Sequence, residues 1–211
     1  MSRIKRRKLT AKVSGSTEPE KKGISKQAIW TIILGGTMVF SIFGIMFSGY
    51  DSGKQEYTYN DRTFQRTNTG WSTGIDDKMI EFNYLPQEVE SINISTEPAN
   101  ILKESKVIYI TFNPNNKSVQ QFELARLQLG LVLSDNFQIY AMPGITEPSS
   151  LYQQPIADCN NATQALPVVK FIDSNETKAY VENDCVIIEA EKTTVLAVKD
   201  KILYQMLGIM D

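Results

Sequence analysis

The chain has 211 residues, no histidine and a formal net charge of −2. The lack of histidine excludes a Ser-His-Asp triad, a Cys-His pair and an HExxH zinc site, because histidine is the general base or the metal ligand in each. Residues 1–26 hold nine basic and two acidic groups, so the totals of 22 basic and 24 acidic groups leave 13 and 22 for residues 27–211. Nucleic-acid binding needs clustered Lys and Arg, so we expect no nucleic-acid partner for this acidic body. The sequence also contains no motif that predicts a metal or a cofactor.

The N-terminal quarter of the chain predicts a membrane anchor. Residues 1–26 are charged and lack apolar periodicity, which is typical of a disordered tail. The run from Ala28 to Gly49 contains no charged residue. As a helix it would be about 33 Å long, and a bilayer core is about 30 Å thick. We therefore predict a disordered basic cytoplasmic tail (1–26), a transmembrane helix (27–49) and a linker (50–55).

The basic tail also predicts the topology. Lys and Arg that flank a span stay in the cytoplasm, so we expect a single-pass protein of the cell membrane with its C-terminal domain extracytoplasmic. Two alternatives stay open. A cleaved signal peptide would have a shorter apolar region of about 7–15 residues, and the RIKRRKL cluster could bind anionic lipid or nucleic acid.

Small residues recur along the predicted span at i, i+4, i+7 and i+11. Such a face lets two helices approach closely, so it could contact a partner transmembrane helix or a second copy of the chain in addition to the lipid bilayer. The four residues are Thr37, Ser41, Gly44 and Ser48.

Residues 56–86 predict a small antiparallel β-meander. Thr and aromatic residues alternate partially, and Asn, Asp and Gly supply the turns. The expected strands are Glu56–Tyr59, Thr63–Arg66 and Lys78–Tyr84. The aromatic side chains of this part could cover the core face of the sheet or form a sugar- or peptide-binding platform; they are Tyr57, Tyr59, Phe64 and Trp71.

Residues 87–211 predict an extracytoplasmic α+β domain with a mixed sheet in the order β-α-β-β-β-α. A strand–helix–strand with two apolar strands is a parallel βαβ unit. The first part, 87–104, reads as a short strand at Val89–Ile94 and a short helix near Pro98–Lys103. The further elements are a strand at Lys106–Asn113, a helix at Ser118–Ser134, strands at Phe137–Pro143, Pro167–Ile172 and Lys178–Ala190, and a helix at Thr193–Met210.

Several details of this domain are also predicted. Ser118 would cap its helix together with Gln121, and Asp135-Asn136 would end that helix. The last strand would return beside the strand before it, with a bulge at Asn183-Asp184. This element order is typical of a thioredoxin-like domain, although no CxxC motif is present and the order is no evidence of redox activity.

Cys159 and Cys185 are the only cysteines. Both follow the predicted anchor, on the side of the membrane where disulfides persist. A structural bridge would close a loop of about 25 residues and contribute about 3 kcal/mol. A redox-active pair and two free thiols are the alternatives, but the neighbours of Cys159 include no cation that would lower its thiol pKa.

Four N-x-S/T sequons follow the predicted anchor and are candidate glycosylation sites if the compartment supplies the transferase. The acceptor residues are Asn93, Asn116, Asn161 and Asn175.

The segments YNDRTFQRTNTGW, EFNYLPQEVESI and CNNATQALPVVKF, with the C-terminal run through both cysteines, resemble a family of uncharacterised single-pass membrane proteins from archaea. The resemblance implies an archaeal cell-surface protein with a cysteine-linked outer domain, and it implies no activity. Together the observations favour a non-enzymatic, membrane-anchored interaction module or accessory subunit of a cell-envelope complex. The alternatives are a thioredoxin-like thiol–disulfide oxidoreductase that uses Cys159 and Cys185, and an extracellular sugar- or peptide-binding protein.

Overall fold

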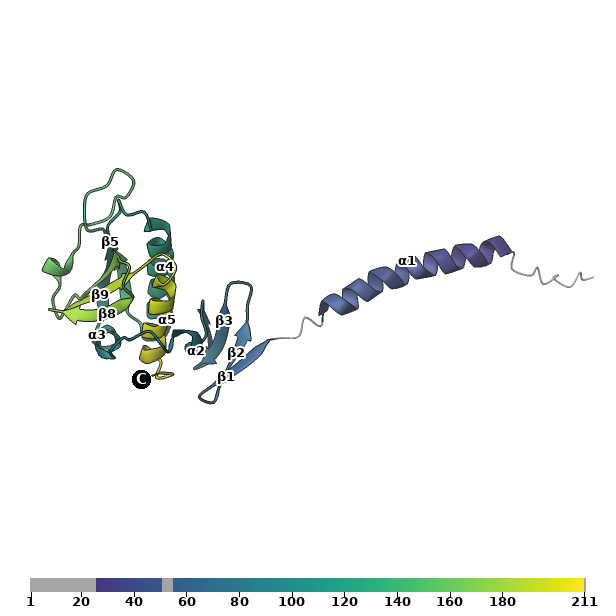
Figure 1. Ribbon diagram of the computed structural model, residues 1–211, viewed down its shortest axis with the longest axis horizontal. Coiled ribbons are helices and arrows are strands. Elements are labelled where there is room, and N and C mark those ends of the chain that lie inside the picture. Colours follow the sequence, from purple (N-terminus) through teal and green to yellow (C-terminus); the bar gives the residue numbers. More distant parts are fainter. Residues whose placement is uncertain (1–25, 51–54, 211) are drawn as a thin grey trace, which may run out of the picture. The chain divides into compact units, whose positions relative to one another are not determined.

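The computed structural model describes residues 26–50 and 55–210, without the side chains of Ala28 and of residues 42–50. The chain divides into two units, Met1–Gly53 and Lys54–Asp211. In the first unit, α1 (Lys26–Tyr50) is one continuous helix (Figure 1). In the described part of the chain, no helix is both long enough and apolar enough to cross a membrane. Residues 1–25 of the predicted tail and residues 51–54 of the predicted linker lie outside the described residues.

The predicted small-residue face lies on α1 but is only partly described. Thr37 and Ser41 are exposed, and the Thr37 hydroxyl donates to the carbonyl of Leu34 at 3.0 Å. The side chains of Gly44 and Ser48 lie outside the described residues. A helix–helix contact through this face therefore stays a prediction.

The second unit begins with the predicted antiparallel β-meander. Its strands follow one another in chain order: β1 (Glu56–Tyr59), β2 (Arg62–Arg66), β3 (Trp71–Ile75) and β4 (Lys78–Phe82). The first and last turns contain two residues each, all with positive φ. Asn and Asp tolerate this left-handed conformation, and turns of this type match the twist of the strands they join. The strand β3 was not predicted.

A five-stranded mixed sheet forms the rest of the unit. Its spatial order is β6-β5-β7-β9-β8, and β8 alone is antiparallel to its neighbour. The α+β class and the parallel βαβ unit are thereby confirmed. The elements are α2 (Pro86–Val89), α3 (Glu97–Glu104), β5 (Val107–Phe112), α4 (Val119–Phe137), β6 (Tyr140–Pro143), the 3₁₀ turn η1 (Cys159–Asn161), β7 (Val168–Asp173), β8 (Lys178–Glu182), β9 (Cys185–Ala190) and α5 (Val195–Met206).

The predicted pairing of the last strands was wrong. The segment Lys178–Ala190 is two strands, because Asn183 and Asp184 have φ of 46° and 62° and form a tight turn rather than a bulge. The second of these strands, β9, inserts beside β7 and runs parallel to it. The thioredoxin-like element order depended on an antiparallel return beside β7, so the basis for that likeness is lost.

Two boundaries near α4 also differ from the prediction. The helix continues through Asp135-Asn136, because the Asn136 amide donates to the carbonyl of Val132 at 3.2 Å and Lys78 donates to the carbonyl of Asp135. It ends at Gln138, which is left-handed. At the other end, the Ser118 side chain forms no cap hydrogen bond.

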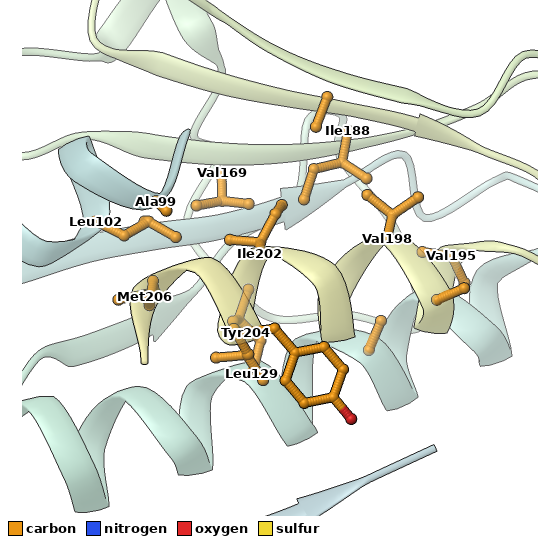
Figure 2. Close-up of a cluster of buried hydrophobic side chains, with 14 of the residues drawn as sticks. Ala99, Leu102, Leu129, Val169, Ile188, Val195, Val198, Ile202, Tyr204 and Met206 are labelled. Carbon is orange, nitrogen blue, oxygen red and sulfur yellow. The ribbon is translucent and has the colours of Figure 1, made fainter. Parts of the chain in front are cut away.

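The helix α5 is the centre of the second unit. In Figure 2 it lies against the mixed sheet and beside α4, with Val198 and Ile202 directed toward the sheet and Tyr204 on another side. The Tyr204 ring stacks on Phe82 of the meander at a centroid distance of 4.3 Å and meets Phe64 edge-on at 6.0 Å. The meander and the mixed sheet therefore share one hydrophobic core.

A buried carboxylate holds the end of the meander on α5. One oxygen of Asp200 accepts from the backbone N–H groups of Asn83 at 2.8 Å and Tyr84 at 3.0 Å, and the other lies 2.5 Å from the Lys199 ammonium. Tyr204 donates to the carbonyl of Tyr84 at 2.5 Å. Burial raises the pKa of Asp200, and Lys199 and the two N–H donors oppose that effect. We call this arrangement the Asp200 clamp.

The segment after the clamp was predicted to contain a strand at Val89–Ile94, which is wrong. Side chains of α5 take its carbonyl oxygens instead: Lys201 donates to Glu90 and Ile92, and Gln205 donates to Ile94 at 3.3 Å. The chain's other end is fixed similarly, because the Asn60 amide donates to the carbonyl of Ile209 at 3.2 Å.

The Asp200 clamp makes a stability prediction. Asp200→Ala leaves two backbone N–H groups buried without an acceptor, and it leaves the buried Lys199 ammonium without its carboxylate, with the Asn83 side-chain oxygen at 3.3 Å as its remaining acceptor. We therefore expect the free energy of unfolding of the full chain to fall by about 3–5 kcal/mol. Asp200→Asn retains an acceptor oxygen and should lose less. Urea unfolding followed by circular dichroism measures both. Lys192→Ala, at an exposed position before α5, is the control, and an Asp200→Ala protein as stable as the wild type would contradict the clamp.

Candidate functional site

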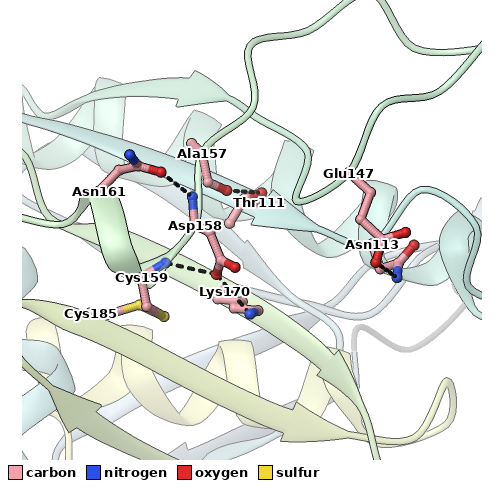
Figure 3. A network of polar contacts seen from close by, with 9 residues as sticks. All are labelled: Thr111, Asn113, Glu147, Ala157, Asp158, Cys159, Asn161, Lys170 and Cys185. Carbon is pink, nitrogen blue, oxygen red and sulfur yellow. Dashed lines mark hydrogen bonds and ion pairs between the residues drawn. A yellow bond between two sulfur atoms is a disulfide. The ribbon is translucent and has the colours of Figure 1, made fainter.

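The predicted disulfide is present. Cys159 of η1 and Cys185, the first residue of β9, are bonded with their Cα atoms 5.2 Å apart (Figure 3). Cys185 is fully buried, and Cys159 is partly buried. The bridge therefore ties the long loop 144–166 to the sheet, as the sequence predicted.

Polar contacts hold the same loop against the face of the sheet that faces away from α4 and α5. The Thr111 hydroxyl of β5 donates to the carbonyl of Ala157 at 2.9 Å. Lys170 of β7 pairs with Asp158 at 2.7 Å, and the same Asp158 oxygen accepts from the Cys159 N–H at 2.7 Å (Figure 3). Together with the disulfide, these contacts cover a second apolar cluster that includes Val168, Cys185 and Ile187. The cysteines thus complete a layer of the fold.

A polar crevice of about 360 Å³ lies where β5 and β7 end. The carboxyl ends of parallel strands are a common place for ligands. Here, however, the polar groups satisfy one another: Asn113 donates to Glu147 at 3.0 Å, and Lys170 is paired with Asp158. Among the described residues, no group of three His, Cys, Asp or Glu side chains is placed to hold a metal ion. The crevice offers no chemistry beyond its own internal contacts.

The outer face of α4 is different, because it leaves apolar side chains uncovered. Leu124, Leu127 and Leu131 are 41%, 57% and 54% exposed. Residues spaced i, i+3 and i+7 lie in one row on a helix, so the three form a continuous ridge, here called the α4 stripe. The opposite face of the helix contributes Phe122, Leu129 and Leu133 to the core.

A groove flanks the α4 stripe on either side. The first, the β4 groove, has a volume of about 600 Å³ and lies between α4 and β4, an edge strand of the meander. The second has a volume of about 360 Å³ and lies between α4 and β6, an edge strand of the mixed sheet. Exposed Met79 belongs to the first groove and exposed Tyr140 to the second. The stripe and the two grooves adjoin at Leu131, which lines both grooves.

The structure also places the other predicted site residues. Asn93, Asn161 and Asn175 are exposed, whereas Asn116 is partly buried and accepts from the Ser118 N–H at 2.9 Å. These sequons remain candidate glycosylation sites.

The meander aromatics do not form a platform. Phe64 is fully buried, and the partly buried Tyr57, Tyr59 and Trp71 pack against the core. This arrangement is the core-face alternative that the sequence left open.

Sequence reasoning missed the α4 stripe, although its signal was present. The sequence predicts this helix without assigning its apolar residues to separate faces. At about 100° per residue, however, Leu124, Leu127 and Leu131 lie nearly opposite Phe122 and Leu133. Two opposed apolar faces on one helix indicate that one of them contacts something outside the core.

Comparisons with known proteins give no assignment: no family model matches the chain, and neither the curated proteins nor the solved structures contain a significant match.

The disulfide makes a prediction that separates its structural role from redox catalysis. Cys159→Ser should lower the free energy of unfolding by about 3 kcal/mol. Without the bridge, the unfolded chain regains the conformational entropy that the closed loop removes. Asn160→Ser, at the exposed neighbouring position, should change it little. In the native full chain, mild reductant should release no thiol for maleimide labelling, whereas rapid reduction and labelling would indicate an exchanging pair.

Proposed function

We propose that the chain is a membrane-anchored, extracytoplasmic protein-interaction module, an accessory subunit of a cell-envelope assembly without an activity of its own. The observation that carries the proposal is the α4 stripe. Soluble monomers rarely expose a contiguous apolar patch, and such patches commonly mark protein–protein contacts. The proposal therefore places the docking surface on α4.

The physical reason is the free energy that the stripe would gain on docking. Burying an exposed leucine side chain is worth about 1.5–3 kcal/mol, and each leucine of the stripe is about half exposed. Three of them, with Met79 and Tyr140 beside them, supply the apolar centre that a specific interface needs. Beside Leu127, the same groove is lined by Glu123, whose carboxylate pairs with the buried Arg126.

The proposed location rests on the amino-acid sequence and on the disulfide. An uncharged apolar run follows nine basic groups, and this order predicts a cytoplasmic N-terminus with an outer C-terminal domain. The disulfide supports an oxidising compartment, because such bonds are rare where thiols are kept reduced.

The docking surface can be tested by photocrosslinking. A benzophenone side chain at position 127 of the full chain, in native membranes, should give a discrete crosslinked band, and Leu127→Glu should reduce the amount of co-purified partner at least tenfold. Position 151 is the matched control, because Leu151 is 85% exposed and lines neither of the grooves beside α4. Equal crosslinking at both positions, or none at 127, would reject the α4 stripe as the docking surface.

The proposed topology can be tested with single added cysteines in intact cells. A membrane-impermeant maleimide should label Lys192→Cys without lysis and Ser2→Cys only after lysis, since the native cysteines are bonded to each other. The reverse pattern, or protection of both positions in intact cells, would contradict the proposed location.

A further inference from the structure

The β4 groove contains an unpaired strand edge. In the β3–β4 hairpin, Ile75 and Lys78 flank a two-residue turn, and residues that flank such a turn form a hydrogen-bonded pair. Lys78, Ile80 and Phe82 therefore direct their backbone groups toward β3. Consistent with this alternation, a Cβ atom on Gly70 would lie 2.0 Å from the Phe82 carbonyl oxygen, on the β3 side.

The residues between them, Met79 and Glu81, direct their backbone N–H and C=O groups to the other side, into the groove. Because β4 is an edge strand, no further strand pairs with it there. Within the described residues, these groups have no backbone partner outside the hairpin. The groove thus presents donors and acceptors at the spacing of a β-ladder.

The opposite wall of the groove carries a second unsatisfied group. The Gln128 side-chain oxygen is buried and has no hydrogen-bond partner among the described residues. It belongs to α4, which also contributes the exposed Leu131 and the partly buried Val132 to the same wall. The wall therefore contains one buried acceptor without a partner, beside the apolar side chains of Leu131 and Val132.

We infer that the β4 groove binds an extended peptide segment of a partner protein, which adds a fifth strand to the meander. An extended backbone is the chemistry that matches alternating N–H and C=O groups along an edge. Every second side chain of the segment would contact Leu131 and Val132 and should be apolar. One donor would reach the Gln128 oxygen when the partly exposed Gln128 side chain turns into the groove. This inference rests on the proposed function, since it names the kind of partner that the α4 surface accepts.

The geometry favours a lone strand over a second copy of the chain. In a symmetric pairing of two β4 edges, each copy would bring its own α4 along the shared edge. Since α4 forms the far wall of the groove, both helices would compete for the space across from the same strand pair. A segment without a helix beneath it avoids this conflict.

The charged residues on the β4 edge do not by themselves account for the features of the β4 groove. Lys78 and Glu81 protect an exposed edge against uncontrolled pairing, and Lys78 reaches across to the Asp135 carbonyl at one end of the groove. Such protection requires neither an unsatisfied buried oxygen on the facing helix nor exposed apolar residues on both walls. Both are accounted for when a strand occupies the site.

The test selects peptides from a displayed library of random ten-residue sequences on the full chain in detergent micelles. Selected peptides should show alternating apolar residues, and fluorescence anisotropy should show binding that Glu81→Pro weakens at least tenfold. Proline at this position removes a groove-facing N–H and leaves the β3 ladder intact. Thr58→Pro is the matched control, because Thr58 holds the equivalent outward position on β1, the other edge of the same sheet.

Two further measurements make the result independent of the proline variant. Gln128→Met should weaken peptide binding several-fold without lowering the thermal midpoint, because it removes an acceptor that has no partner in the free protein. Hydrogen exchange should show fast amides at positions 79 and 81 in the free chain that become protected when peptide binds, while position 80 stays protected throughout.

The outcomes separate this inference from the proposed function. Failure to select peptides, or peptides insensitive to both Glu81→Pro and Gln128→Met, overturns the groove inference. If the position-127 crosslink survives in that case, the interaction module stands without it. A dimer in sedimentation velocity that Glu81→Pro dissociates also overturns it, since the occupant would then be a second copy.

Discussion

The burial of α5 between two sheets is the constraint on which the second unit depends. This helix contacts the mixed sheet, α4 and the meander, and it has no side that faces solvent along most of its length. Apolar packing alone does not fix how the meander sits on the helix, because aromatic contacts tolerate sliding. The Asp200 clamp does fix the position of the meander on the helix. Two consecutive N–H groups can both reach one carboxylate oxygen in only one placement of the meander. The buried charges of α5 thus have a structural role.

The sequence predicted the elements of the fold better than their pairing. Period-two alternation and the Asn and Asp turns were sufficient for three strands of the meander but not for β3, and apolar runs were sufficient for β5, β7 and α5. The Asn-Asp pair at residues 183–184 was predicted to form a bulge, whereas it forms the turn between β8 and β9. Strand order is a property of the whole sheet, and no local pattern predicts that β9 inserts beside β7.

The candidate site was predictable only in part. Two cysteines on the same side of a predicted anchor suggested the bridge between Cys159 and Cys185, which is present. The β4 groove could not be predicted, because it depends on two elements about fifty residues apart in the sequence meeting along one edge. The α4 stripe could have been predicted from the sequence, because the angular positions of Leu124, Leu127 and Leu131 follow from helix geometry alone. The prediction for segment 83–94 was wrong for another reason. Its carbonyl oxygens accept hydrogen bonds from side chains of α5, and sequence propensities do not account for such partners.

The central position of α5 has a consequence for biosynthesis. This helix leaves the ribosome more than a hundred residues after the meander, yet the meander relies on it for its aromatic contacts and on Ile209, just beyond it, for the Asn60–Ile209 bond. The second unit therefore cannot fold stepwise as it emerges. Its early strands must wait, with their apolar faces uncovered, until α5 has been made, and a chain truncated before α5 will be a substrate for chaperones and proteases rather than a smaller working protein.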